Sequence, residues 1–391
     1  MQSNRFHKFL DRYVGIPIGI ILFIISRFYY FFAKCIKLKT RRTRDKELSI
    51  PPKRILFIQL SALGDTILAI PTVRAFRQEF PDTEISFLAS PTNLSYLEHC
   101  PYIDKHILFN KPSFKLIFGL RQERFDYIID LEHWSRFSML LAYFIGASRI
   151  IGFSAAGQHR HYLFTDSIPH VPGKHEVLNF LSITDKFCDK IEDISLEVWI
   201  EDSELQWCHN VFVEEELQKD QRIVILHPEA GRRGEPRRRW IQENFIELAD
   251  IITEKYGVQV VLTGAPDEVQ LSQTIETQTV CKTINLAGKT KVNQLAALFN
   301  QADLVISGNC GPMHLAAATG TPVIAIHGPT NSEQWGPWGE NNICLEATLP
   351  CSPCLNLGFE YACQALPDGT SPCMHTISVS EVLQACDRYL G

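Results

Sequence analysis

The stretch ILFIQLSALGDTILAIP, residues 55–71, decides the fold class. Its first six residues are almost wholly apolar, which predicts a strand buried on both faces. A helical pattern follows directly and extends over 66–80. A strand that leads through a short turn into a helix is the first half of a βαβ unit, so the stretch predicts an α/β fold with a parallel sheet.

The same alternation continues along the chain in two series. The first adds strands at 84–90, 105–109, 127–132 and 149–153 and a helix at 135–145. The second has strands at 222–228, 258–264, 283–288, 303–308 and 322–328, separated by helices at 241–256, 267–278, 291–301 and 312–319. A polar stretch near 189–220 separates the two series, and Ser378 with Glu381 forms a capping box for a last helix at 379–390. We therefore predict two Rossmann-like domains that face a cleft, over residues 51–205 and 206–391.

Composition and charge exclude several classes of protein. The chain has 391 residues, of which 45% are hydrophobic and 21% charged, as in ordinary globular proteins. The net charge of −6 is uneven, because residues 1–50 carry +8 and the rest carries −14. A nucleic-acid-binding protein would have its basic patch on the folded body, so we expect no nucleic-acid partner.

The basic head also contains an apolar run that predicts membrane attachment. Residues 14–33 are mostly apolar and carry no charge except that of Arg27, and this run of about 20 residues is near the length that spans a bilayer. The run is followed by seven basic residues: Lys34, Lys37, Lys39, Arg41, Arg42, Arg44 and Lys46. By the positive-inside tendency, residues 1–50 form an anchor segment that holds the protein on the cytoplasmic face of the inner membrane through residues 1–46. Both a spanning helix and a helix in the plane of the interface fit this pattern.

Two missing patterns restrict the chemistry. No two glycines are spaced G-x-G, so a dinucleotide cofactor is not expected. No two aspartates are spaced D-x-D, the pair that commonly binds the divalent ion of nucleotide-sugar enzymes. We therefore expect no cofactor and no catalytic metal ion, and nucleotide chemistry that relies on protein donors and helix ends.

The first candidate site is the turn of SALGDTILAIP, residues 61–71, directly after the first strand. Gly64 would permit a tight turn and a close backbone approach to a ligand. Ser61 belongs to the same turn, and Asp65 lies at the carboxyl edge of the sheet, where ligands of α/β proteins bind. An N-cap role for Asp65 is the structural alternative.

The second candidate site is SGNCGPMHLAAATGTPVIAIHGPT, residues 307–330, in which a strand ends and a helix starts near Pro312. The N–H groups and the dipole of such a helix start favour an anion. His314 in the first turn can donate to a phosphate, and the loop Gly328–Thr330 ends the next strand on the same edge. These paired loops suit a diphosphate.

The third candidate site is HPEAGRRGEPRRRW, residues 227–240, which follows a strand end in the second series. Five arginines fall between positions 232 and 239. Because arginine forks bind phosphate in a bidentate manner, this run predicts a phosphate contact.

The ordered set of these motifs, with VVLTGAPDE, NLAGKT and CSPC…CM, resembles glycosyltransferase family 9, the lipopolysaccharide heptosyltransferase family, over about residues 53–390. The resemblance implies the GT-B fold, with the acceptor mainly on the first domain and the nucleotide sugar mainly on the second. It further implies an inverting, metal-independent transfer of heptose, or a related sugar, from an ADP-activated donor to a lipid-linked lipopolysaccharide-core or similar glycan.

The resemblance also assigns roles to residues. It makes Asp65 the catalytic base that deprotonates the acceptor hydroxyl, and it places the family's phosphate-binding Lys on Arg238 and a donor-loop Asp on Asn309. Asp267 and Glu268 fall where an acidic residue of the family approaches the ribose. The implied donor site is thus Arg238, Asp267, Glu268, Asn309, Gly311, Pro312, Met313, His314, Gly328 and Thr330, with Ser61 and Gly64 on the acceptor side.

Two questions stay open from the sequence. Loss of the donor-loop carboxylate at Asn309 leaves a family member with a different nucleotide sugar, or a non-catalytic GT-B scaffold at the membrane, as alternatives. The cysteines Cys344, Cys351, Cys354, Cys363 and Cys373 cluster, and C-x2-C is a zinc-site spacing. A zinc site, a disulfide and unbridged thiols all remain possible readings of this cluster.

Overall fold

The computed structural model describes residues 17, 21, 51–188, 191–218, 220–229, 236–355 and 361–391. The predicted membrane-anchor segment therefore lies outside the described residues, except for Pro17 and Ile21. In the part of the chain that is described, no helix is long and apolar enough to cross a membrane.

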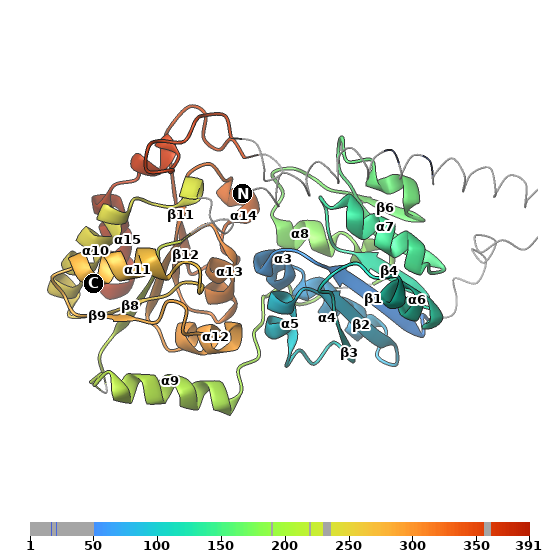
Figure 1. Cartoon of the computed structure of the whole chain (residues 1–391), viewed down its shortest axis with the longest axis horizontal. Coiled ribbons are helices and arrows are strands. Elements are labelled where there is room, and N and C mark those ends of the chain that lie inside the picture. Colours follow the sequence, from blue (N-terminus) through green and yellow to red (C-terminus); the bar gives the residue numbers. More distant parts are fainter. Residues whose placement is uncertain are drawn as a thin grey trace, which may run out of the picture. The chain divides into compact units, whose positions relative to one another are not determined.

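The chain forms two compact units, which Figure 1 colours from blue to red along the sequence. The first unit comprises the chain up to Ala62, Ala69–Val171 and Val177–Asp193. The second comprises Leu63–Leu68, Pro172–Glu176 and Ile194–Gly391, so it includes residues 63–68 of the first candidate site.

The first unit is built on a parallel six-stranded sheet with the order β3-β2-β1-β4-β5-β6. Its strands are β1 (Arg54–Gln59), β2 (Glu84–Ala89), β3 (Lys105–Leu108), β4 (Tyr127–Asp130), β5 (Arg149–Ser154) and β6 (Asp166–Pro169). Its helices are α4 (Ile70–Glu79), α5 (Pro91–Leu97), α6 (Phe114–Gln122), α7 (Arg136–Ile145) and most of α8 (Glu176–Leu181), with short 3-10 turns η3 (Arg160–Leu163) and η4 (Thr184–Lys186).

The second unit repeats this plan, with a parallel sheet in the order β12-β11-β10-β7-β8-β9. Its strands are β7 (Ile223–His227), β8 (Gln259–Leu262), β9 (Thr283–Asn285), β10 (Leu304–Gly308), β11 (Val323–His327) and β12 (Asn342–Glu346). Its helices are α3 (Leu63–Leu68), α9 (Asp202–Glu214), α10 (Gln242–Tyr256), α11 (Val269–Gln278), α12 (Val292–Asn300), α13 (Gly311–Ala318), α14 (Ser332–Trp335) and α15 (Val379–Leu390), with turns η5 (Pro236–Arg238) and η6 (Pro372–His375).

Both sheets are covered by helices, which explains why the central strands are apolar on both faces. In the second unit, α10, α11 and α15 pack together on one face, and α12 and α13 lie on the other (Figure 1). Every residue of β7, β10 and β11 is buried. The α/β prediction, with two parallel sheets, is confirmed, as is the capping box of Ser378 and Glu381.

Three local predictions were wrong or incomplete. The helix expected over 66–80 is two helices, α3 and α4, because the ring of Pro71 cannot continue a helix from the preceding turn. Strands β6 and β12 were missed, since they are short, partly exposed edge strands without a continuous apolar run. The polar stretch near 189–220 contains a helix, α9.

Candidate functional site

Each sheet has one switch point, where the order of strands reverses, and ligands of open α/β sheets bind outside the carboxyl ends of strands at such a point. In the first unit the switch lies between β1 and β4, and in the second it lies between β7 and β10. Ser61 follows β1, Arg238 follows β7 and Asn309 follows β10. Ser61 and Asn309 therefore come directly from strand ends at the switch points, whereas Arg238 lies in η5, further along the connection after β7.

At the first switch point, the turn after β1 is held by a carboxylate that the sequence did not single out. Glu132 follows β4 and is buried. Its Oε1 accepts the backbone N–H groups of Leu60 and Ser61, each at 2.8 Å, and the Ser61 hydroxyl lies 2.9 Å from both carboxylate oxygens. Burial raises the pKa of Glu132, while these hydrogen bonds act in the opposite direction.

A second buried carboxylate supports the first. The guanidinium of Arg160 pairs with Asp130 and donates to the backbone carbonyl of Glu132, and Ser138 donates to Asp130 at 3.0 Å. Burial raises the pKa of Asp130 to about 7, although the cation of Arg160 offsets part of the effect. A fully buried Asp–Arg pair is costly to form. Through its contact with the carbonyl of Glu132, this pair fixes the residue that holds the turn of Ser61.

The turn differs from the sequence prediction in its details. Gly64 was expected to permit the tight turn, but the residue with a left-handed backbone is Ala62, whose φ is 56°. Asp65 is half-buried and lies in the first turn of α3, so it does not occupy the N-cap position of the alternative interpretation. Its carboxylate is nevertheless in the first turn of a helix, where a negative charge is favoured.

The glycine at position 64 is explained by a close approach between α3 and α13. A Cβ on Gly64 would lie 2.9 Å from His314 Cδ2. A Cβ on Gly311 would lie 3.1 Å from Leu63 Cβ and 3.3 Å from the backbone nitrogen of Gly64. The two helix starts therefore meet backbone to backbone, and Asp65 is brought to the N-terminal end of α13. The predicted close approach at Gly64 was to a ligand, whereas the neighbour that the structure gives it is the start of α13.

The start of α13 has the features of an anion site. Its N-cap residue, Cys310, makes no side-chain capping hydrogen bond, although the N–H of Met313 acts on its thiol. Pro312 has no N–H, so the N–H of Gly311 is the first-turn donor without a partner inside the helix. His314 is buried, and burial lowers its pKa to about 3, so the ring is neutral and offers one N–H donor. His314 Nδ1 has no hydrogen-bond partner among the described residues.

Of the three described arginines in the basic run, Arg238 reaches the donor loop. Arg237 donates to the carbonyl of Cys363 at 2.5 Å, and Arg239 pairs with Glu229 at 3.1 Å. Arg238 instead donates to Asn309 Oδ1 at 3.5 Å, a long hydrogen bond. Arg237 and Arg239 are thus used within the protein, whereas the phosphate contact of Arg238 stays a prediction.

Asn309 is fixed from both sides of its amide. Its Nδ2 donates to the carbonyl of Trp335 at 2.9 Å, and its Oδ1 faces Arg238. An aspartate could not make the first of these bonds, because a carboxylate has no N–H group. The loop therefore stabilises asparagine at position 309, where the family pattern has aspartate.

The remaining predicted donor residues are less clearly placed for a ligand. Glu268 Oε2 accepts the N–H of Ala265 at 2.6 Å and so closes its own turn, while Asp267 is exposed. The hydroxyl of Thr330 pairs with His327 Nδ1 at 3.0 Å. The space beside Gly328 is filled by Met374 Sδ, and Met313 is a fully buried core residue next to Pro312.

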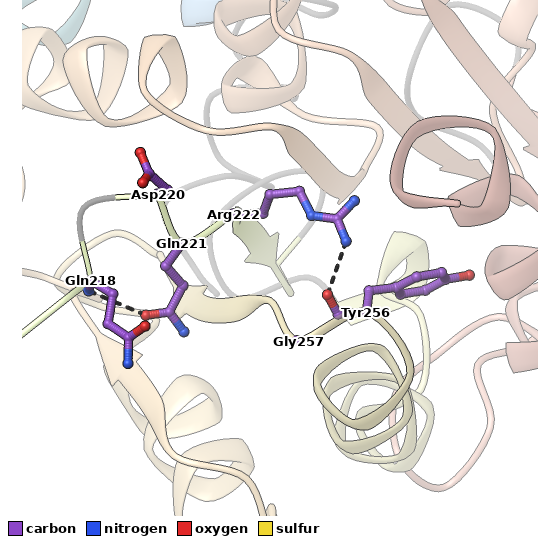
Figure 2. Close-up of a pocket in the computed structure, with 6 residues that line it drawn as sticks. All are labelled: Gln218, Asp220, Gln221, Arg222, Tyr256 and Gly257. Carbon is purple, nitrogen blue, oxygen red and sulfur yellow. Dashed lines mark hydrogen bonds between the residues drawn. The ribbon is translucent and has the colours of Figure 1, made fainter.

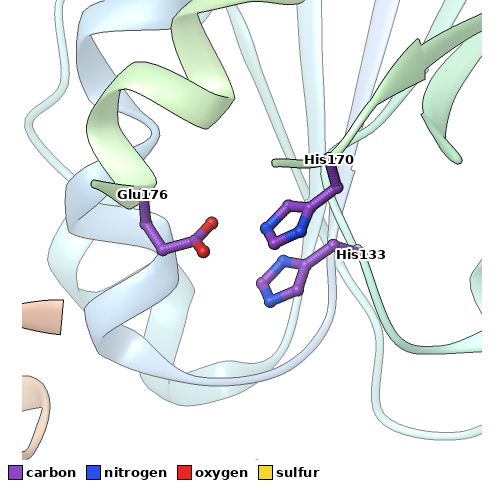
Figure 3. Close-up of side chains that lie close together, drawn as sticks. All are labelled: His133, His170 and Glu176. Carbon is purple, nitrogen blue, oxygen red and sulfur yellow. The ribbon is translucent and has the colours of Figure 1, made fainter. Parts of the chain in front are cut away.

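Two further features involve residues that the sequence did not mark as a site. A surface pocket is lined by Gln218, Asp220, Gln221, Arg222, Tyr256 and Gly257 (Figure 2). The guanidinium of Arg222 donates to the carbonyl of Tyr256, the last residue of α10, at 2.9 Å and to that of Leu390, the last residue of α15, at 2.7 Å. A cation at helix C-termini stabilises the helices, so this contact is structural. In the first unit, the buried rings of His133 and His170 stack with centroids 4.9 Å apart, and Figure 3 draws this pair with Glu176.

The comparisons with known proteins agree with the motifs. The chain matches the family model of glycosyltransferase family 9 (heptosyltransferase) over residues 113–363. It is 25% identical over 300 residues to the lipopolysaccharide core heptosyltransferase OpsX of Haemophilus influenzae, which covers 75% of this chain and 83% of that protein. It is 27% identical over 301 residues to lipopolysaccharide heptosyltransferase 3 of Escherichia coli K12, which covers 72% of this chain and 84% of that protein.

Solved structures support the fold. A family 9 glycosyltransferase from Veillonella parvula superposes with a TM-score of 0.71 at 23% identity, covering 86% of this chain and 97% of that one. The ADP-heptose lipopolysaccharide heptosyltransferase II of Escherichia coli gives a TM-score of 0.69 at 21% identity, covering 86% and 98%. Because the family match spans more than half of the chain, this protein belongs to glycosyltransferase family 9, the heptosyltransferase family, and is a glycosyltransferase.

Proposed function

We propose that the protein transfers a heptose, or a related sugar, from an ADP-activated donor to a lipopolysaccharide-core or similar surface glycan, with inversion and without a catalytic metal ion. The observation that carries the proposal is the contact between Gly64 and Gly311, which brings Asp65 to the start of α13. A carboxylate beside a helix start that favours an anion is the pairing that base-assisted transfer from a sugar diphosphate needs. The names of the relatives supply the sugar and the acceptor class.

In the proposed reaction, Asp65 takes the proton of the acceptor hydroxyl as that oxygen attacks the anomeric carbon of the donor. The bond from the sugar to the diphosphate breaks, and negative charge develops on the leaving diphosphate. The first-turn N–H groups of α13, the neutral ring of His314 and the cation of Arg238 would stabilise this charge. These donors serve the role that a divalent cation has in other glycosyltransferases.

The donor sugar rests on weaker support than the reaction class. Asn309 replaces the acidic residue of the family pattern and holds Arg238 through its amide oxygen. This difference lies next to the proposed diphosphate site, and it favours a second candidate within the same class, a family member with another nucleotide sugar. A donor screen separates the two: ADP-heptose should raise the unfolding temperature more than UDP-, GDP- or dTDP-sugars do.

Asp65→Asn tests the base. The amide keeps the size of the side chain but cannot accept the proton, so kcat should fall by roughly 10²–10⁴ while donor affinity is retained. Donor affinity measured by calorimetry controls for folding and for the donor site. Turnover of Asp65→Asn at the wild-type rate would reject the assignment. A wild-type protein that transfers no sugar from any donor would instead favour the non-catalytic scaffold.

We further propose that residues 1–46 hold the enzyme on the cytoplasmic face of the inner membrane. The support is the sequence: about 20 mostly apolar residues, with seven basic residues after them. Attachment should resist high salt, because the apolar contribution is not screened. Recovery of the full-length protein wholly in the soluble fraction at low salt would contradict this proposal.

A further inference from the structure

The outer face of helix α6, in the first unit, exposes aromatic side chains. Phe114 and Phe118 lie one turn apart on this helix, and their exposed fractions are 94% and 62%. The opposite face already serves the fold, because Leu120 is buried in the hydrophobic core of the sheet and Leu116 packs against that core. Helix α6 is therefore apolar on both faces, although the described part of the protein covers only one of them.

The end of helix α7 extends this surface. The two helices pack against each other (Figure 1), and the guanidinium of Arg121 in α6 donates to the carbonyl of Phe144, the penultimate residue of α7, at 2.8 Å. The side chain of Phe144 is also exposed. Single exposed apolar side chains are common, but a group of them marks a binding surface. Phe114, Phe118 and Phe144 form the aromatic patch of the first unit.

The chain around the aromatic patch is basic. Residues 105–122 contain four Lys or Arg and no Asp or Glu, whereas the whole of residues 51–391 carries −14. One of the four, Lys105, pairs with Glu123 at 2.7 Å and neutralises the acid that follows α6. The other three are exposed and, in the described part of the chain, belong to no ion pair: Lys111, Lys115 and Arg121. The aromatic patch is thus bordered by uncompensated positive charge.

The aromatic patch lies at the end of the first unit where the chain enters from residues 1–46. The N–H of Lys53 donates to Asp126 Oδ2 at 2.7 Å, and Asp126 lines one surface pocket together with Phe118. From residue 46 to residue 53 the chain can span at most roughly 25 Å. If residues 1–46 hold the protein at a membrane, as proposed above, they also keep the aromatic patch within reach of the lipid surface.

We propose that α6 binds an anionic lipid surface, with the aromatic patch inserted between the lipid head groups and the three exposed cations beside their phosphates. Aromatic side chains that reach the boundary of the acyl chains, next to basic residues that face anionic lipid, are typical of a helix that binds in the membrane interface. Contact in the plane of the interface suits α6, because its nine residues are too short to span a bilayer.

This contact would fix the orientation of the first unit. The proposed anchor and α6 both belong to the chain of this unit, so binding of α6 follows attachment of the anchor as an intramolecular step. A single anchor on a linker leaves a domain free to rotate, whereas a second contact determines which side of the domain faces the lipid. The inference goes beyond the proposed function, since none of the residues assigned to sugar transfer lies in α6.

The test places the photo-crosslinking amino acid p-benzoylphenylalanine at single positions of the full-length protein, bound to vesicles of phosphatidylethanolamine and phosphatidylglycerol in equal parts. At position 118 it exchanges one exposed aromatic ring for another, and illumination should produce a covalent lipid adduct that mass spectrometry detects. Position 280 is the matched control, because Val280 is apolar and 93% exposed but lies in the second unit, and it should give no adduct. Position 21, in the proposed anchor, reports attachment of the anchor separately.

The contribution of charge is measured at the same position. Each basic residue near an anionic surface strengthens binding by a factor of roughly five. Phosphatidylcholine in place of phosphatidylglycerol should therefore lower the adduct yield at position 118 several-fold, and so should Lys111→Gln combined with Lys115→Gln. An unchanged yield in this double variant would overturn the role of the cations. Its unfolding temperature should equal that of the wild type, because both lysines are exposed.

The pattern of adducts separates this proposal from that of the anchor. A lipid adduct at position 21 but none at position 118 would overturn the contact of α6 and leave the anchor intact. A yield at position 118 no higher than at position 280, or a cross-linked dimer of this chain in place of the lipid adduct, would also overturn it. An adduct at position 118 without one at position 21 would support α6 and contradict the anchor, and no adduct at either position would overturn both.

Discussion

Removal of the Glu132 carboxylate should reduce both the stability and the turnover of the enzyme. Glu132 accepts two successive N–H groups, those of Leu60 and Ser61, and also contacts the Ser61 hydroxyl. The chain enters α3 two residues after Ser61, and α3 carries Asp65. Glu132→Ala would leave both N–H groups without their acceptor and would release the turn that leads to the proposed base.

The structure sets the expected magnitudes. An N–H group that loses its buried acceptor costs about 1–3 kcal/mol, and because Leu60 and Ser61 are only partly buried, water should replace some of the lost bonding. We expect Glu132→Ala to lower the free energy of unfolding by roughly 2–4 kcal/mol. Glu132→Gln retains an acceptor and removes a buried charge, so its loss should be only about 1 kcal/mol. A displacement of Asp65 by about 1 Å would lower kcat as much as 10²-fold.

The chain offers a matched control at the other end of the same strand. Asp126 Oδ2 accepts the N–H groups of Lys53 at 2.7 Å and Arg54 at 3.1 Å, which repeats the Glu132 arrangement at the amino end of β1. Asp126→Ala should lower the unfolding temperature but leave kcat and KM unchanged. Thermal unfolding and steady-state kinetics, recorded well below both unfolding temperatures, separate the two effects.

Three results would show that Glu132 does not position Asp65. If Glu132→Ala is destabilised but turns over at the wild-type rate, Glu132 stabilises the sheet without positioning Asp65. If Asp126→Ala loses as much kcat as Glu132→Ala, the loss comes from general destabilisation. Positioning also requires that Glu132→Gln retain most of the kcat that Glu132→Ala loses.

Three other predictions follow from the site. Arg238→Ala should weaken ADP binding, measured by calorimetry, by about 1.5–3 kcal/mol. The control Arg239→Ala removes the partner of Glu229 and should leave ADP affinity unchanged. Unchanged ADP affinity in Arg238→Ala would exclude Arg238 from the donor site. Burial lowers the pKa of His314 from 6.5 to about 3, and those of His227 and His327 from 6.5 to about 4. Below pH 6.5 the unfolded chain therefore binds more protons than the folded chain does. The free energy of unfolding should fall on acidification from pH 6.5 towards pH 4. Each histidine contributes up to about 1.4 kcal/mol per pH unit, and an unfolding temperature equal at pH 7.5 and 5 would contradict this. Transfer activity should survive EDTA; its complete loss and recovery with Mg²⁺ or Mn²⁺ would reveal a catalytic cation site.

The sequence alone was sufficient for the central strands of both sheets. Strands such as β1, β7, β10 and β11 are buried on both faces, so each is a continuous apolar run bounded by turn residues. Periodicity is a local property and can be recognised without partners. The edge strands β6 and β12 lack that pattern, because much of their surface stays in contact with solvent.

Tertiary structure decided which motif residues can act together. The sequence marked Gly64 as a turn glycine, but its need for a missing Cβ comes from His314, some 250 positions away. Before the structure, only the family resemblance separated Arg238 from the other four arginines, and the fold then gave Arg237 and Arg239 partners within the protein. Glu132 had no local signal at all, since its function depends on the parallel pairing of β4 with β1. Such choices depend on which strand ends become neighbours, and that is set by sheet order rather than by any short stretch of sequence.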